Sequence, residues 1–123
     1  MFERAKIGGH IYNMADALTR DGAPVDRRVI EMFNPFMDVA VKYMKLEKLQ
    51  ADQAAIAMII NLANTFVKDG LMQKIFDERY DMFISFLRLF HAACLVLDQH
   101  DDRYRRARAL YDADVFRALE EMN

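Results

Sequence analysis

Apolar residues recur every three or four positions along the whole chain, and this spacing most constrains the fold that the chain can adopt. No stretch of four residues alternates between apolar and polar side chains clearly enough to predict a strand. Glycine and proline, which interrupt regular structure, number only four and two in 123 residues. The sequence therefore predicts an all-α fold: a single helical domain over residues 1–123, built as a compact bundle of five or six helices.

The first helix should have a weak beginning and a sharp end. Gly8 and Gly9 disfavour the start of its apolar stripe, so the ordered helix is expected to begin near His10. The stretch DGAP, residues 21–24, combines a glycine that stops a helix with a proline suited to the first turn of the next one.

Later boundaries follow from the same kind of signal. Pro35 should break the second helical segment, because proline inside a helix removes a hydrogen bond and clashes with the preceding turn. The next helix is expected over 51–68, with Gly70 as its left-handed cap. A last helical segment is expected to start near Arg103, after an aspartate that can cap it.

The stretch 71–99 contains the longest apolar run of the chain. Its later part is interrupted only by Ser85, Arg88 and His91. A helix that is apolar on most sides is typically surrounded by other helices. We therefore expect one helix over 71–99 at the centre of the bundle, or at the core of a dimer.

Composition and charge narrow the classes of function. Hydrophobic residues make up 54% of the chain, and a domain this small has little interior in which to bury them, so part of this surface is expected to meet a partner. The net charge of −2 gives no overall attraction to nucleic acid or to anionic membranes. The first residues show no signal-peptide pattern, and the apolar run is interrupted and short for a membrane span. These features predict a cytoplasmic protein without a membrane partner.

His91 and Cys94 are the clearest candidates for chemistry. They lie three residues apart and would share one face of a helix, where a thiolate and an imidazole could form a nucleophilic pair. Catalysis would also require an orienting group, an oxyanion donor and access for substrate. The neighbouring residues are mostly apolar, which favours packing in the core. We therefore expect no catalytic residues and no enzymatic activity.

The three histidines do not predict a metal site. His100 precedes two aspartates, and these residues could supply nitrogen and oxygen ligands. Consecutive residues of a loop converge poorly on one ion, and the chain lacks the ligand spacings of zinc and di-iron sites. The sequence predicts neither a metal nor a cofactor.

Arginines and methionines are the candidate partner-binding residues. The run RYRRAR, residues 103–108, could contact phosphates, but aspartates four residues before two of its arginines favour an ion-paired helix face. A patch that binds a protein partner is the second interpretation of this run. Its members would be Arg103, Arg105 and Arg106. Met37 and Met72 lie off the main apolar stripes and are expected to be exposed, where adaptable methionine side chains suit a partner.

We interpret the chain as a small non-enzymatic protein that binds another protein, expected to act as a homodimer. An apolar Met/Phe surface flanked by charges would make the contact. This profile is common among regulators, inhibitors and accessory proteins of bacteria or their viruses. The first alternative is a helical regulator with an apolar small molecule in a pocket of the bundle. A less favoured alternative is a nucleic-acid-binding protein that uses the arginines at 103–108.

Overall fold

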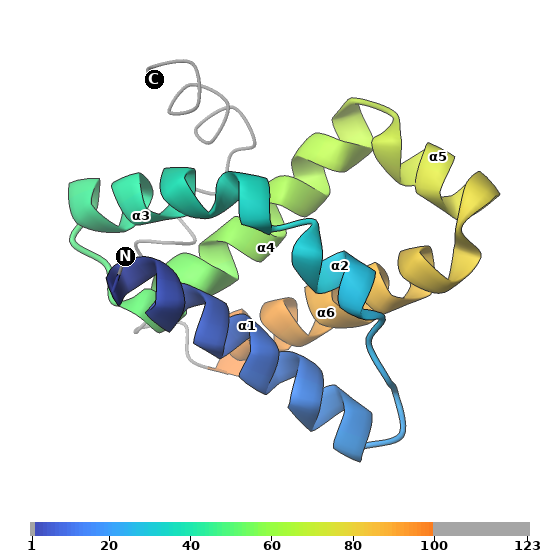
Figure 1. The fold of residues 1–123 in the computed structure, drawn as a ribbon, viewed down its shortest axis with the longest axis horizontal. Helices are drawn as coiled ribbons and strands as arrows, with labels where there is room; N and C mark the ends of the chain where they lie inside the picture. The colour runs from blue at the N-terminus through green and yellow to red at the C-terminus, as the bar shows by residue number, and fades with distance from the viewer. Residues whose placement is uncertain (1, 100–123) are drawn as a thin grey trace.

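The computed structural model describes residues 2–99, and every regular element in this range is helical (Figure 1). The predicted all-α bundle is therefore confirmed. The elements are as follows: α1 (Phe2–Arg20), α2 (Arg27–Glu31), the 3-10 helix η1 (Asn34–Phe36), α3 (Met37–Leu46), α4 (Ala51–Lys68), α5 (Leu71–Glu78) and α6 (Tyr80–Gln99). The segment expected from Arg103 lies outside the described residues.

α1 begins well before His10, so the predicted start of this helix is wrong. The helix passes through both glycines, with Ile7 and Ile11 buried on either side of them. Gly8 faces α3, where a β-carbon at this position would lie 3.4 Å from Cε of Met37, an ordinary contact distance. Burial of Ile7 and Ile11 outweighs the low helix propensity of the two glycines.

The other predicted boundaries are largely confirmed. Gly22, with φ 87°, follows α1, and Gly70, with φ 77°, follows α4, whose predicted bounds 51–68 match the structure. The break at Pro35 takes the form of η1, a single tight turn that joins α2 to α3. Pro24 instead lies in the loop before α2, which is capped by the Asp26 carboxylate.

The central helix is α4, and the prediction that placed 71–99 at the centre is wrong. Every residue of α4 from 54 to 63 is buried, and α4 packs against α1, α3, α5 and α6. Figure 1 shows α4 crossing the middle of the molecule, with α3 on one side and α1 and α6 on the other. Alanines at 54, 55, 57 and 63 explain this position, because small side chains let neighbouring helices approach from several directions.

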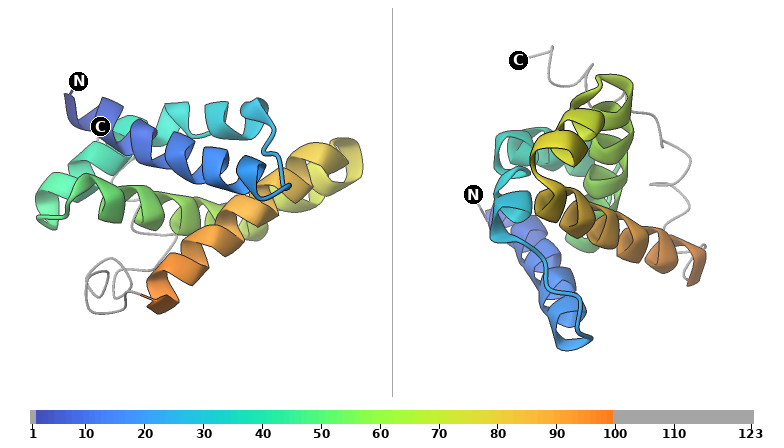
Figure 2. Two further views of the ribbon diagram at one scale, coloured as in Figure 1. Left: turned by 90° about the horizontal axis from the view of Figure 1, so that it is seen from below. Right: turned by 90° about the vertical axis from the view of Figure 1, so that its right-hand side faces the viewer.

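The expected single helix over 71–99 is in fact two helices. Arg79, with φ −144° and ψ 70°, leaves the helical region and separates α5 from α6. α5 is itself turned by 85° from α4, so the corner between α5 and α6 projects at one end of the molecule (Figure 2). No glycine or proline marks the break, so no local signal in the sequence predicts it.

α6 buries only one of its faces. Ser85, Phe86, Leu89, Ala93 and Leu97 form this inner face. The ring of Phe86 stacks on Phe33 at a centroid distance of 5.8 Å and contacts Phe66 of α4 at 5.6 Å. The inner face therefore joins α6 firmly to α2 and α4, and the opposite face is left toward solvent.

A candidate protein-binding surface on α5 and α6

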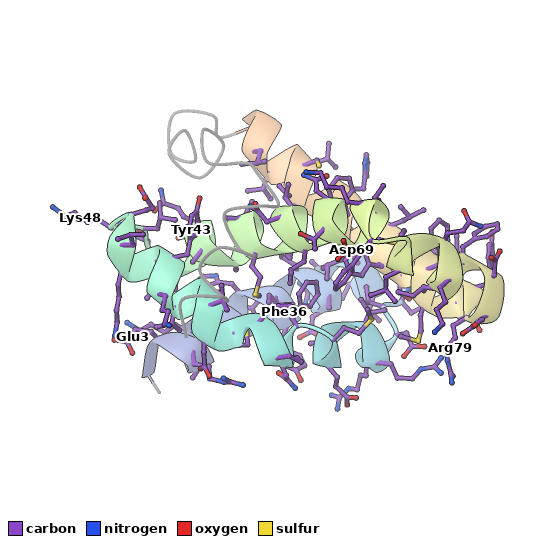
Figure 3. All side chains as sticks on the ribbon, turned by 90° about the horizontal axis from the view of Figure 1, so that it is seen from above. Glu3, Phe36, Tyr43, Lys48, Asp69 and Arg79 are labelled. Carbon is purple, nitrogen blue, oxygen red and sulfur yellow. The ribbon has the colours of Figure 1, made fainter. Side chains whose placement is uncertain are left out.

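The exposed apolar side chains gather on the two helices that project from the bundle. Seven large apolar side chains are exposed in the described part of the chain, and four of them lie on α5 and α6: Phe76, Tyr80, Leu87 and Leu95. With the half-buried Phe83 they form what we call the outer surface. Figure 3 shows the labelled Arg79 at this end of the molecule, far from Glu3 and Lys48 at the other.

An aromatic cluster forms the corner of the outer surface. The ring of Phe76 meets that of Phe83 edge to face at 5.0 Å and that of Tyr80 at 5.6 Å. These arrangements suit the ring quadrupoles and hold the rings in fixed orientations. The break at Arg79 makes the cluster possible, because it folds α5 back until Phe76 reaches the first turn of α6. The corner therefore presents rigid aromatic rings to solvent: Phe76 is 43% exposed and Tyr80 57% exposed.

An open groove borders the outer surface. It has a volume of about 580 Å³ and lies between the loop that precedes α2 and the first three turns of α6. Its walls are as follows: Pro24, Val25 and Asp26 from the loop, and Tyr80, Asp81, Ile84, Ser85 and Arg88 from α6. Tyr80 and Ile84 thus belong to both the groove and the face of α6 that carries the outer surface.

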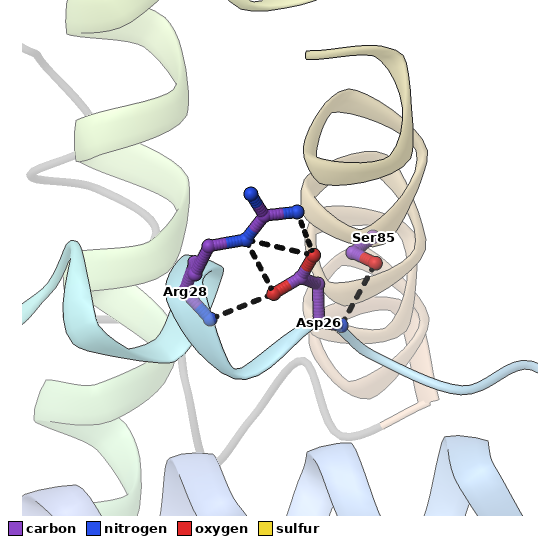
Figure 4. A network of polar contacts seen from close by, with 3 residues as sticks. All are labelled: Asp26, Arg28 and Ser85. Atoms are coloured by element: carbon purple, nitrogen blue, oxygen red, sulfur yellow. Dashed lines mark hydrogen bonds and ion pairs between the residues drawn. The ribbon is translucent and has the colours of Figure 1, made fainter.

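A small polar network fixes the loop side of the groove (Figure 4). The backbone N–H of Asp26 donates to Oγ of the buried Ser85 at 2.9 Å, which ties the loop to α6. The Asp26 carboxylate accepts from the backbone N–H of Arg28 at 2.9 Å and from its guanidinium at 2.6 Å. Ser85 therefore has a structural role on the inner face, although it interrupts the apolar pattern.

The same network keeps Asp26 charged. Hydrogen bonds from the side chain and the backbone of Arg28 lower the pKa of Asp26, and the carboxylate in turn raises the pKa of Arg28. The two remaining charged groups of the groove are Asp81 and Arg88, both exposed on α6. Arg88 makes one long hydrogen bond, 3.5 Å from its Nη1 to the carbonyl of Pro24. Opposite charges are therefore presented along one edge of the outer surface.

His91 and Cys94 lie toward the outer side of α6. His91 is exposed and Cys94 is half-buried against the edge of the core. The expectation that both pack in the core is therefore wrong for His91, because Leu89, Ala93 and Leu97 occupy the inner positions of this stretch. Within residues 2–99 no group of three or more His, Cys, Asp or Glu side chains is arranged to hold a metal ion. His100 lies beyond this range.

Two of the predicted partner-binding residues, Met37 and Met72, lie in the described part of the chain, and neither belongs to the outer surface. Met37 is only 5% exposed and packs in the core beside Gly8, so the prediction that it is exposed is wrong. It lies off the sequence stripe but faces α1, which the stripe could not show. Met72 is half-buried against the core. Arg103, Arg105 and Arg106 lie outside the described residues.

Sequence reasoning missed the outer surface, although a signal for it was present. Tyr80, Ile84, Leu87, His91 and Cys94 follow one another at spacings of four and three, which marks a second stripe on α6 besides the buried one. Together the two stripes make the helix apolar on most sides, and for this reason the sequence predicts a helix surrounded by others.

The same apolarity lets α6 meet a simple criterion for membrane spans. The stretch Tyr80–Leu97 is long enough for a single span and has a mean hydropathy of 1.5. α4 and α5 meet the criterion only when the two helices, bent by 85°, are counted as one span. Only 28% of this stretch is buried, through the inner face that packs on α4, and one such helix is weak evidence for a membrane span.

Comparisons with known proteins add no relative: no family model, no curated protein and no solved structure matches the chain.

Proposed function

We propose that this protein is a non-enzymatic binding protein whose outer surface is buried against another polypeptide. The observation that carries the proposal is the concentration of exposed apolar side chains on α5 and α6. Single exposed apolar residues are normal on any protein, but a contiguous group with charges at its rim is typical of interaction sites.

The chemistry of the outer surface suits a protein partner. Tyrosine and phenylalanine are well suited to interfaces, because they bury a large area and lose little conformational entropy. The rings of Phe76, Tyr80 and Phe83 already hold one another in place, so binding would order few side chains. Asp81 and Arg88 at the edge would orient the partner.

The alternative of an apolar ligand inside the bundle has less support. Two further hollows lie beside α1, one of about 270 Å³ lined in part by His10, Met14 and Ile56, and one of about 660 Å³ lined in part by Lys6 and Asp52. Like the groove beside α6, both open at the surface and neither has a phenylalanine in its wall. A cavity lined by methionine and phenylalanine, which this alternative requires, is not among them.

Photo-crosslinking tests the proposed function. Benzoylphenylalanine placed at position 87, on the outer surface, is expected to give covalent adducts with a polypeptide when cells that express the full chain are irradiated. Tyr12 is the matched control, because it is 45% exposed against 40% for Leu87 but belongs to α1 and not to the outer surface. Mass spectrometry identifies the adducts.

Two results would contradict the proposal. One is equal crosslinking from positions 12 and 87, which would show that exposure alone decides the yield. The other is crosslinking from position 87 to lipid only, which would assign the outer surface to a membrane. Adducts that disappear when Tyr80→Asp is added would support binding at the aromatic corner.

A further inference from the structure

The outer side of α6 carries the repeat of a coiled-coil seam. Tyr80, Ile84, Leu87, His91 and Cys94 follow the alternating spacing of four and three residues that places side chains along one line of a helix. All five are exposed or half-buried, so the seam is directed away from the core. From Tyr80 to His91 it is about 16 Å long, at 1.5 Å per residue.

The two edges of this seam have different chemistry. One edge carries Asp81 and Arg88, which lie seven residues apart and so occupy equivalent positions in successive repeats. The other edge carries Phe83 and Phe90, also seven apart and both half-buried. A helix that pairs with this seam must therefore present charge on one side and apolar surface on the other.

A second α6 in the antiparallel direction meets this requirement. With a two-fold axis crossing the helix between Ser85 and Phe86, Tyr80 faces His91 of the second copy and Ile84 faces Leu87 of the second copy. Each pair then occurs twice, as the symmetry of a two-chain interface demands.

The same register matches both edges. Antiparallel pairing brings the charged edge of one helix next to the charged edge of the other. Asp81 then lies beside Arg88 of the second copy, offset by about 3 Å along the helix axis. On the other edge Phe83 lies beside Phe90 of the second copy. Parallel pairing would instead set the charged edge against the phenylalanines. The charge pattern therefore selects both the direction and the register.

We propose that α6 pairs with α6 of a second copy, antiparallel about a two-fold axis, with two reciprocal Asp81–Arg88 ion pairs. This inference rests on the proposed function and names the partner: the polypeptide that covers the outer surface is another copy of this chain. Phe76 lies on α5 beside Tyr80, at a ring distance of 5.6 Å, and so flanks the end of this contact.

Charge reversal at the two edge residues tests the pairing. Sedimentation equilibrium of the full chain should show a dimer. Asp81→Arg and Arg88→Asp should each raise the dimer dissociation constant at least tenfold, about 1.4 kcal/mol, because each places like charges together twice. An equimolar mixture of these two variants should form a 1:1 heterodimer, since every edge contact is again between opposite charges. The double variant D81R/R88D should dimerise like the original chain.

Asp16→Arg and Arg20→Asp on α1 provide the matched control. They reverse exposed charges four residues apart on another helix and should leave the dissociation constant unchanged. Circular dichroism confirms that each variant is folded, and the double variant keeps the test decisive if one single variant unfolds.

Several outcomes overturn the pairing. A wild-type chain that stays monomeric at several hundred micromolar refutes it, as does a dimer that is indifferent to both reversals or a mixture that fails to form the heterodimer. These outcomes do not refute the proposed function, which is tested separately. Crosslinking from position 87 would still detect a different polypeptide bound to a monomeric chain. Adducts with the mass of two copies of this chain support both proposals.

Discussion

Leu87 and Leu89 on α6 offer a direct test of its two faces. Leu89 is fully buried on the inner face, whereas Leu87 is 40% exposed on the outer surface. The two residues have the same side chain on the same helix, two positions apart. Replacing each by alanine therefore compares the contribution of the two faces without changing the chemistry of the substitution.

The expected costs differ severalfold. Leu→Ala removes three carbons, about 2.4 kcal/mol of transfer free energy when the side chain is fully buried. At Leu89 a cavity next to Phe86 adds to this, so Leu89→Ala should lower the free energy of unfolding by about 3–4 kcal/mol. At Leu87 the removed atoms border solvent, and the cost should be about 1 kcal/mol or less.

Urea unfolding followed by far-UV circular dichroism measures both changes. The comparison requires a dilution at which the chain is monomeric, because association stabilises the folded state by mass action. With a slope of about 1–3 kcal/mol per molar urea, Leu89→Ala should move the midpoint down by about 1–4 M, with little change in the slope. Equal losses for the two variants would refute the assignment of inner and outer faces.

Three further predictions concern the rest of the fold. Gly70→Ala should lower stability by about 1 kcal/mol in urea unfolding, because alanine is strained at φ 77° although a β-carbon there meets no atom within 4 Å; an unchanged midpoint would contradict the left-handed cap. Asp26→Ala should cost about 1 kcal/mol at neutral pH through loss of the α2 cap. Because the pKa of Asp26 is lowered, its contribution is present above its ordinary value of 3.8 and lost as the pH falls below it, so stability curves of the two proteins should converge in acid. Burial, with a smaller effect from the charge of Glu47, raises the pKa of Tyr43 to about 12, so the folded state keeps a proton that the unfolded state loses above pH 10. Stability should therefore fall between pH 10 and 12, by about 2 kcal/mol more than in Tyr43→Phe; parallel curves would contradict this.

The helical class, the break at Pro35 and the bounds of α4 could be predicted, because each depends on local signals. Apolar spacing specifies the buried stripe of a helix, and Gly70 supplies the left-handed residue after α4. Such signals act within one or two turns of a helix, so a single sequence is enough to find them.

The features that were missed depend on tertiary contacts. Nothing local marks Arg79 as a break; α5 folds back there because Phe76 gains contacts with Tyr80 and Phe83. Gly8 and Gly9 lower helix propensity locally, but burial of Ile7 and Ile11 in the fold outweighs this effect. Periodicity also cannot show what covers an apolar face, and for this reason Met37 and the position of α6 were wrongly predicted.

The apolar character of α6 has two separate causes, and they can be told apart by what each face contacts. The inner face is explained by the fold, since Phe86 and Leu89 pack against neighbouring helices. Much of the outer surface has no such explanation within the described residues, because the exposed Leu87 and Leu95 would be as compatible with this fold if they were polar. A second apolar stripe with the spacing of a coiled-coil seam, and with opposite charges seven residues apart along its edge, favours helix pairing over a general lack of polarity. The outer stripe therefore supports the proposed pairing of α6 with the same helix of a second copy.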